Sequence, residues 1–297
     1  MRVRAFAKIN LSLRVLGTRD DGFHELRTIF QSISLHDTLT IRRARGAFRL
    51  TCDDQQCPCD DTNLVWRAAD RVWTAARRRG TPRDLTVQLR KRIPMNAGLG
   101  GGSSDAAAAI RAFARLWRVD DRRARAIGHE LGADVPYFFE GGTVLGLERG
   151  DLLFPLIDRR RASVVLVLPN FGVSTKDAFA WWDSAHWTDG ARRLQPGGQR
   201  RRAEPSADAV TLRSQEFVND LEPVVAHRHP AIARFVTQLR AAGAAHAAMT
   251  GSGSTVFGLF ESERSAARAA RALTSRSQTV LVAQTLNRVR YQRLAAI

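Results

Sequence analysis

Apolar and polar residues alternate along residues 3–15, near the start of the chain. The even positions are mostly polar, whereas the odd positions carry the apolar side chains of Val3, Ala5, Ala7, Ile9, Leu11, Leu13 and Val15. A period of two residues predicts a half-buried β-strand with one face in the core. We therefore expect the polar side chains of Lys8, Asn10 and Ser12 to lie together on the other face.

Further along the chain, strand-like apolar runs alternate with stretches of helical periodicity. Strands are predicted over 85–93, 163–169 and 278–286, and helices over 63–79, from the glycine-rich segment to Trp117, and over 120–132 up to Gly132. Residues 249–286 read in order as strand, loop, strand, helix and strand. This mixture predicts an α+β protein.

A polar, arginine-rich stretch near residues 158–163 is the best candidate for a domain boundary. We predict an N-terminal domain over 1–158 and a C-terminal domain over 159–297. Residues 186–209 are rich in Gly, Pro and Arg, a composition that predicts a loop.

The apolar runs of the chain are too short to span a membrane. Each is far below the roughly 18 residues that a membrane-spanning helix needs. The first residues also lack the apolar region of a signal peptide. We therefore expect a cytoplasmic protein without a membrane partner.

Charge is the strongest feature of the composition. The 297 residues carry a formal net charge of +17, and their hydrophobic content of 44% is that of a globular protein with a core. Such a charge is compatible with nucleic acid, an anionic lipid surface or a polyanionic small substrate. The arginines are spread along the chain instead of forming one basic tail, which favours a solvated surface. We expect no nucleic-acid partner.

Three cysteines, Cys52, Cys57 and Cys59, lie close together in the sequence. Their spacing is compatible with a metal site, but no fourth strong ligand is near them. We interpret them as incidental thiols of a loop. The sequence identifies no metal ligands.

The segment PMNAGLGGGSSDAAAA, residues 94–109, joins a glycine-rich loop directly to a strong helix former. Glycine permits positive φ and close approach to a ligand, and Ser103 or Ser104 is a candidate cap for the helix. Free N–H groups at the start of a helix form a site for phosphate oxygens. A flexible linker is the alternative. Neither the P-loop pattern nor the dinucleotide-binding pattern is present, so a phosphate loop here is of another kind.

Five motifs occur in order across nearly the whole chain: AKINLSL at 7–13, DGFHEL at 21–26, PMNAGLGGGSSDAAA at 94–108, LGADVPYF at 131–138 and TGSGSTVFG at 250–258. Together they resemble the GHMP small-molecule kinases. The resemblance implies a two-domain GHMP kinase fold, with an N-terminal domain like domain 2 of ribosomal protein S5 and a ferredoxin-like C-terminal domain. It also implies ATP and Mg²⁺ as cofactors and phosphorylation of the 2-hydroxyl of 4-diphosphocytidyl-2-C-methyl-D-erythritol, in the non-mevalonate isoprenoid pathway.

The resemblance also assigns catalytic and nucleotide-binding roles. Asp134 is implied as the general base and Lys8 as the group that stabilises charge on the transferred phosphate. The implied ATP-binding residues are Asn63, Pro94, Met95, Asn96, Ala97, Gly98, Leu99, Gly100, Gly101, Gly102, Ser103 and Ser104. From local sequence alone, Asp134 and Asn63 also fit helix caps.

The implied substrate-binding residues are Asn10, Phe23, His24 and Thr175. Phe23 stands where the family more often has tyrosine, so stacking on a base is retained but a phenolic hydrogen bond is lost. His24 is expected to hydrogen-bond the cytosine edge. Thr175 alone fits a helix cap.

Two alternatives remain open at the level of sequence. One is a GHMP kinase for another small alcohol, which would share the glycine loop and Asp134. The other is a non-catalytic, S5-like nucleic-acid-binding protein, which the charge favours but which leaves Lys8 and Asp134 unexplained.

Overall fold

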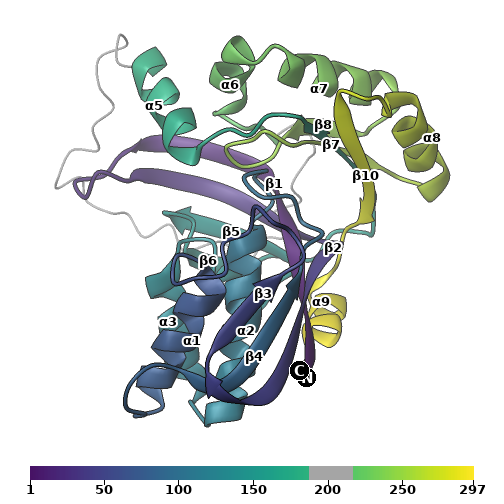
Figure 1. The fold of residues 1–297 in the computed structure, drawn as a ribbon. Helices are drawn as coiled ribbons and strands as arrows, with labels where there is room; N and C mark the ends of the chain where they lie inside the picture. The colour runs from purple at the N-terminus through teal and green to yellow at the C-terminus, as the bar shows by residue number, and fades with distance from the viewer. Residues whose placement is uncertain (187–216) are drawn as a thin grey trace.

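The computed structural model describes residues 1–186 and 217–297, which form two β-sheets with helices packed on them (Figure 1). Of the loop predicted over 186–209, residues 187–209 lie outside the described part of the chain. The two sheets, each with its own helices, agree with the expected α+β, two-domain fold. The boundary at 158/159 stays a prediction.

The first sheet is six-stranded and is built on a long antiparallel pair, β1 and β2. Its strands are β1 (Arg2–Thr18), β2 (His24–Ala47), β3 (Arg49–Cys52), β4 (Arg83–Arg90), β5 (Thr143–Glu148) and β6 (Leu152–Pro155). β3 and β4 run parallel, and the other pairs are antiparallel. The associated helices are α1 (Leu64–Ala75), α2 (Gly101–Trp117), α3 (Asp121–Leu131) and the short α4 (Tyr137–Glu140). The alanine-rich α2 is buried along most of its length, because small side chains let it pack closely on its neighbours.

The second sheet has four antiparallel strands in the order β10-β7-β9-β8. They are β7 (Ser163–Pro169), β8 (His246–Met249), β9 (Val256–Phe260) and β10 (Gln278–Gln284). Helices of this part are α5 (Thr175–His186), α6 (Glu222–Arg228), α7 (Ala231–Ala241) and α8 (Glu263–Leu273). The loop, strand, helix and strand predicted within 249–286 agree with β9, α8 and β10, whereas β8 ends at Met249, where the first strand was predicted to begin.

The predicted first strand is present, but the expectation that it is half-buried is wrong. Between Ala5 and Leu13, every residue of β1 is buried, including the polar Lys8, Asn10 and Ser12. The apolar residues of this stretch pack into the core, while the glycine-rich loop and the second sheet's loops cover the polar face. The alternation therefore separates a core face from a second buried face that is polar.

The chain returns to the first sheet at its last helix, α9 (Arg288–Ala295). Tyr291 of α9 is buried, packs at a tilt against the ring of Phe6 in β1, and donates a hydrogen bond of 2.7 Å to the carbonyl of Phe138. Within the described residues, no helix combines the length and apolar character that crossing a membrane requires.

Candidate functional site

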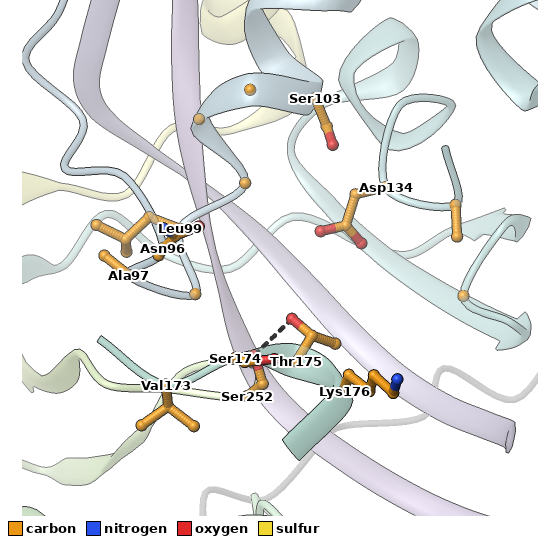
Figure 2. Close-up of a pocket in the computed structure, with 18 of the residues that line it drawn as sticks. Asn96, Ala97, Leu99, Ser103, Asp134, Val173, Ser174, Thr175, Lys176 and Ser252 are labelled. Carbon is orange, nitrogen blue, oxygen red and sulfur yellow. Dashed lines mark hydrogen bonds between the residues drawn. The ribbon is translucent and has the colours of Figure 1, made fainter. Parts of the chain in front are cut away.

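A cleft of about 1450 Å³ lies between the two halves of the molecule. Its walls come from the middle of β1, the tip of the β1–β2 pair, the glycine-rich loop, the segment before α4, the start of α5 and the loop after β8. Figure 2 shows Ser103, Asp134 and Thr175 directing side-chain oxygens into a common space. The fold therefore brings together motifs that are far apart in the sequence.

Lys8 and Asp134 meet at the centre of this cleft. The Lys8 Nζ lies 3.3 Å from the Asp134 Oδ2. The lysine side chain is 5% exposed and the aspartate side chain 35%. Asn10 fixes the ammonium by accepting a 2.7 Å hydrogen bond from it. A nearly buried cation beside an accessible carboxylate suits proton removal from a hydroxyl and stabilisation of charge on a phosphate.

The alternative in which Asp134 caps a helix is wrong. The helix that follows, α4, has Pro136 at its N-cap position and no side-chain capping bond. The carboxylate of Asp134 instead faces the cleft (Figure 2).

Two glycines of the loop have positive φ and make contacts that leave no space for a side chain. Gly98 has φ +72°, and a Cβ there would lie 2.3 Å from the carbonyl oxygen of Thr250. Gly100 has φ +69°, and its Cβ would lie 2.8 Å from the Phe138 ring and 3.1 Å from Lys8 Cε. The amide of Lys8 also donates to the Leu99 carbonyl at 3.0 Å. The loop is therefore packed against both halves of the molecule, which contradicts the flexible-linker alternative.

The start of α2 differs from the predicted serine cap. α2 begins at Gly101 after the left-handed Gly100, with no side-chain capping bond. Ser104 is buried and donates to the carbonyl of Phe6 at 2.7 Å, because β1 passes directly beside the helix. The amides of the first turn thus have no side-chain cap, and a ligand can use them. This arrangement fits a phosphate group.

Asn63 caps α1, as its local sequence suggests. Its Oδ1 accepts a 2.8 Å bond from the amide of Val65, and its Nδ2 donates to the Pro58 carbonyl at 2.7 Å. The residue also lines the cleft, next to Cys57. Burial raises the pKa of the Cys57 thiol to about 12, so it is a poor nucleophile.

The tip of the β1–β2 pair carries Phe23 and His24 beneath α5. Phe23 is 54% exposed, and the Arg149 guanidinium lies 5.3 Å from its ring centre. The His24 ring stacks on Phe179 at a centroid distance of 4.5 Å, and its Nε2 lies 2.7 Å from Asp183 Oδ1. An exposed aromatic ring beside a held imidazole is suited to a planar ligand.

Thr175 and Asn10 both line the cleft and contact the loop after β8. The Thr175 hydroxyl lies 3.0 Å from that of Ser252, shown as a dashed line in Figure 2. The predicted cap belongs instead to Ser174, whose hydroxyl accepts from the amide of Asp177 at 3.4 Å. The backbone amide of Asn10 donates to the Thr250 hydroxyl at 2.9 Å. Both predicted residues therefore lie in the cleft wall.

Sequence reasoning missed several residues of the cleft, among them Lys91, Asp105, Arg149, Phe179 and Asp183. Phe179 and Asp183 are four residues apart and so share one face of α5, a spacing that the sequence contains. Lys91 and Asp105 gave no local signal, because their partners lie elsewhere in the chain.

Models of two known domains match the chain: GHMP kinases N terminal domain over residues 63–142, and GHMP kinases C terminal over residues 199–278. The chain belongs to the GHMP kinase family. Like that family, it is an ATP-dependent small-molecule kinase.

Within the family, the similar relatives share one name. The 4-diphosphocytidyl-2-C-methyl-D-erythritol kinase of Solibacter usitatus (strain Ellin6076) is 42% identical over 98% of this chain and 90% of its own. The protein of the same name from Pelotomaculum thermopropionicum is 37% identical over 95% of this chain and 97% of its own. A crystal structure of 4-(cytidine 5'-diphospho)-2C-methyl-D-erythritol kinase has a TM-score of 0.76 and 31% identity, covering 96% of this chain and 99% of that one.

Proposed function

We propose that this kinase transfers the γ-phosphate of ATP to the 2-hydroxyl of 4-diphosphocytidyl-2-C-methyl-D-erythritol, a step of the non-mevalonate isoprenoid pathway. The observation that carries the proposal is the Lys8–Asp134 pair, which faces the cleft between the glycine-rich loop and the Phe23–His24 tip. The names of the full-length relatives support the same substrate. A cytoplasmic location is part of this proposal.

The Asp134 carboxylate accepts the proton of the attacking hydroxyl in this mechanism. Lys8 stabilises negative charge on the transferred phosphoryl group, and Asn10 keeps the ammonium in place through its 2.7 Å bond. The uncapped amides at the start of α2 hold phosphate oxygens, with Asn63 at the adenine end. Phosphoryl transfer needs mainly positioning and neutralisation of charge, and these groups supply both.

Mg²⁺ is part of the proposal, and the residues present fit it. Ser103 and Asp134 direct oxygen atoms, the donors that Mg²⁺ prefers, into one space (Figure 2). Among the described residues, no group of three or more His, Cys, Asp and Glu side chains forms a metal site. Most ligands would therefore come from the triphosphate and water. When bound, the ion neutralises charge that develops on the phosphates.

Phe23 and His24 are proposed to recognise the cytosine. Phe23 supplies an exposed face for stacking, and Asp183 holds His24 through Nε2. If Nε2 carries the proton, Nδ1 is an acceptor and suits the amino group of cytosine better than the carbonyl of uracil. Thr175 is proposed to contact the methylerythritol hydroxyls from the start of α5.

An ADP-release assay tests the function. The panel of alcohols includes 4-diphosphocytidyl-2-C-methyl-D-erythritol, its uridine counterpart, homoserine and mevalonate. We expect turnover with the cytidine compound and a much lower kcat/KM with the others. Turnover of homoserine or mevalonate without turnover of the cytidine compound would contradict the proposed substrate but leave the kinase class intact.

A further inference from the structure

A second lysine–aspartate cluster adjoins the glycine-rich loop and is almost completely shielded from solvent. The Lys91 Nζ donates to Asp37 Oδ2 at 2.5 Å and to Asp105 Oδ2 at 2.8 Å. The three side chains are 6%, 0% and 3% exposed, respectively. Removing charged groups from water costs free energy unless they are paired, so each charge in this cluster depends on its partner.

The cluster joins the two ends of the loop. Lys91 follows the last residue of β4, and Asp105 lies one turn into α2, so residues 94–100 run between these anchors. Asp37, on β2, adds a third attachment because its Oδ1 accepts from the backbone amides of Arg92 and Ile93, the latter at 2.8 Å. The three side chains thus fix the spacing between the strand, the helix and the sheet.

The packing between the two anchors is tight. A Cβ at Gly101 would lie 2.9 Å from Ile93 Cγ2 and 3.4 Å from the Lys91 Nζ. A shift of Lys91 therefore moves the first turn of α2, where the uncapped amides are. The ammonium already donates hydrogen bonds to Asp37 and Asp105, so it is not a free charge for a ligand.

We propose that Lys91, held between Asp37 and Asp105, is a positioning residue that keeps the amides of the glycine-rich loop directed at the triphosphate of ATP. The inference rests on the proposed placement of the triphosphate at residues 94–104. It does not depend on the identity of the alcohol substrate.

The first test is calorimetric titration of Lys91→Met with ADP and with adenosine, at a temperature where circular dichroism shows the variant folded. ADP should bind roughly tenfold more weakly or worse, because the loss of a buried hydrogen-bonding partner shifts the anchors. Adenosine makes no use of the phosphate loop and should keep its Kd. An equal loss for both ligands would overturn the proposal.

A matched control separates positioning from loss of stability. Arg288 donates to the carbonyls of Thr143 at 2.9 Å and Leu156 at 3.3 Å and lies outside the cleft wall. Arg288→Met should lower the Tm and leave the Kd for ADP unchanged. A similar loss of ADP affinity in this variant would show that destabilisation alone is the cause.

A second pair of variants covers the case in which Lys91→Met does not fold, and excludes direct binding of phosphate by Lys91. Asp105→Asn keeps an acceptor for the Lys91 ammonium and should bind ADP like the parent. Asp105→Ala removes the anchor on α2 and should weaken ADP binding roughly tenfold. If Lys91 binds phosphate directly, Asp105→Ala frees the ammonium, and ADP binding stays equal or strengthens. That result would overturn the proposal.

Discussion

The glycine-rich loop lies between two lysine–aspartate clusters that differ in their access to solvent. In the Lys8–Asp134 pair, the carboxylate is 35% exposed and the charged atoms are 3.3 Å apart. In the Lys91 cluster, both carboxylates are almost completely buried, with contacts of 2.5 and 2.8 Å. The same two residue types therefore occur in an open arrangement and in a closed one.

The difference indicates which cluster can take part in chemistry. A carboxylate that faces a cleft can accept a proton from a substrate and release it to water. A carboxylate sealed against an ammonium has no such route, and its contribution is to structure. Variants of the two clusters separate the chemical role from the structural one.

Replacement of Asp134, whose carboxylate lines the cleft, should have the largest effect on turnover. Asp134→Asn keeps the shape of the side chain but cannot accept the proton, so kcat should fall roughly 100-fold to 10,000-fold. The KM for ATP should change little. Steady-state ADP release measures both constants.

The control for that variant is Asp120→Asn. Asp120 caps α3 by accepting from the amide of Arg123 at 2.9 Å, and it lies outside the cleft wall. Its kcat should equal that of the parent. Near-normal turnover in Asp134→Asn would remove the general base from the mechanism.

Loss of the buried Lys91 ammonium should have the largest effect on the free energy of unfolding. Lys91→Met leaves the carboxylate of Asp37 buried without its ionic partner, which should cost about 3–5 kcal/mol of unfolding free energy. Urea denaturation followed by circular dichroism measures this change. Arg161→Met, which breaks the exposed pair with Glu263, is the control and should change stability little. Equal stabilities of the two variants would show that the closed cluster is not a stabilising unit.

The hairpin tip lies apart from both clusters, and a change there should affect substrate binding alone. Phe23→Ala should raise the apparent KM of the cytidine substrate by a factor equivalent to about 1–3 kcal/mol, the usual contribution of base stacking. The KM for ATP should not move. Phe154→Ala is a suitable control because Phe154 is also exposed, at 42%, but lies outside the cleft wall. An unchanged KM in Phe23→Ala would contradict the stacking.

The contribution of the Lys91 cluster to the free energy of unfolding should also depend on pH. Burial raises the pKa of Asp105 to about 8, although Lys91 lowers it and Asp37 raises it further. The folded protein therefore holds a proton that the unfolded chain releases, so this contribution to stability is complete at low pH and is lost as the pH rises toward the folded pKa.

This pH dependence is measured by comparing the parent with Asp105→Asn in urea between about pH 5 and about pH 8. The stability of the parent relative to Asp105→Asn should fall with rising pH by less than about 1.4 kcal/mol per pH unit, the limit for one proton. A relative stability that rises with pH would indicate an ionised Asp105 at neutral pH.

Local sequence was sufficient for most of the elements. The helices α1, α2 and α3 and the strands β4, β7, β9 and β10 lie where periodicity and turn residues predict them, within a few residues. Asn63 caps α1 as its position suggests. These features depend on neighbours within one or two turns of chain, which the sequence contains directly.

The predicted site depended on motifs, and the fold brings their residues into one cleft. Lys8, Asp134, Phe23, His24 and Thr175 all line it. Their assigned roles remain proposals. The serine cap of α2 was predicted wrongly, because the Ser104 hydroxyl has a partner on β1, 98 residues away in the chain, that local pattern does not reveal.

By itself, the sequence determined the alternation of β1, the glycine-rich loop and the helix that follows it, because periodicity and the absence of a Cβ are local properties. Only the tertiary structure decided that the polar face of β1 is buried and that Lys91 has two carboxylate partners. The Lys91 Nζ reaches Asp37 across 54 residues of chain and Asp105 across 14. Whether such charges are paired and shielded from water depends on how β2, β4 and α2 pack together. That packing leaves the Asp134 carboxylate accessible to solvent and buries the side chains of Asp37 and Asp105 almost completely.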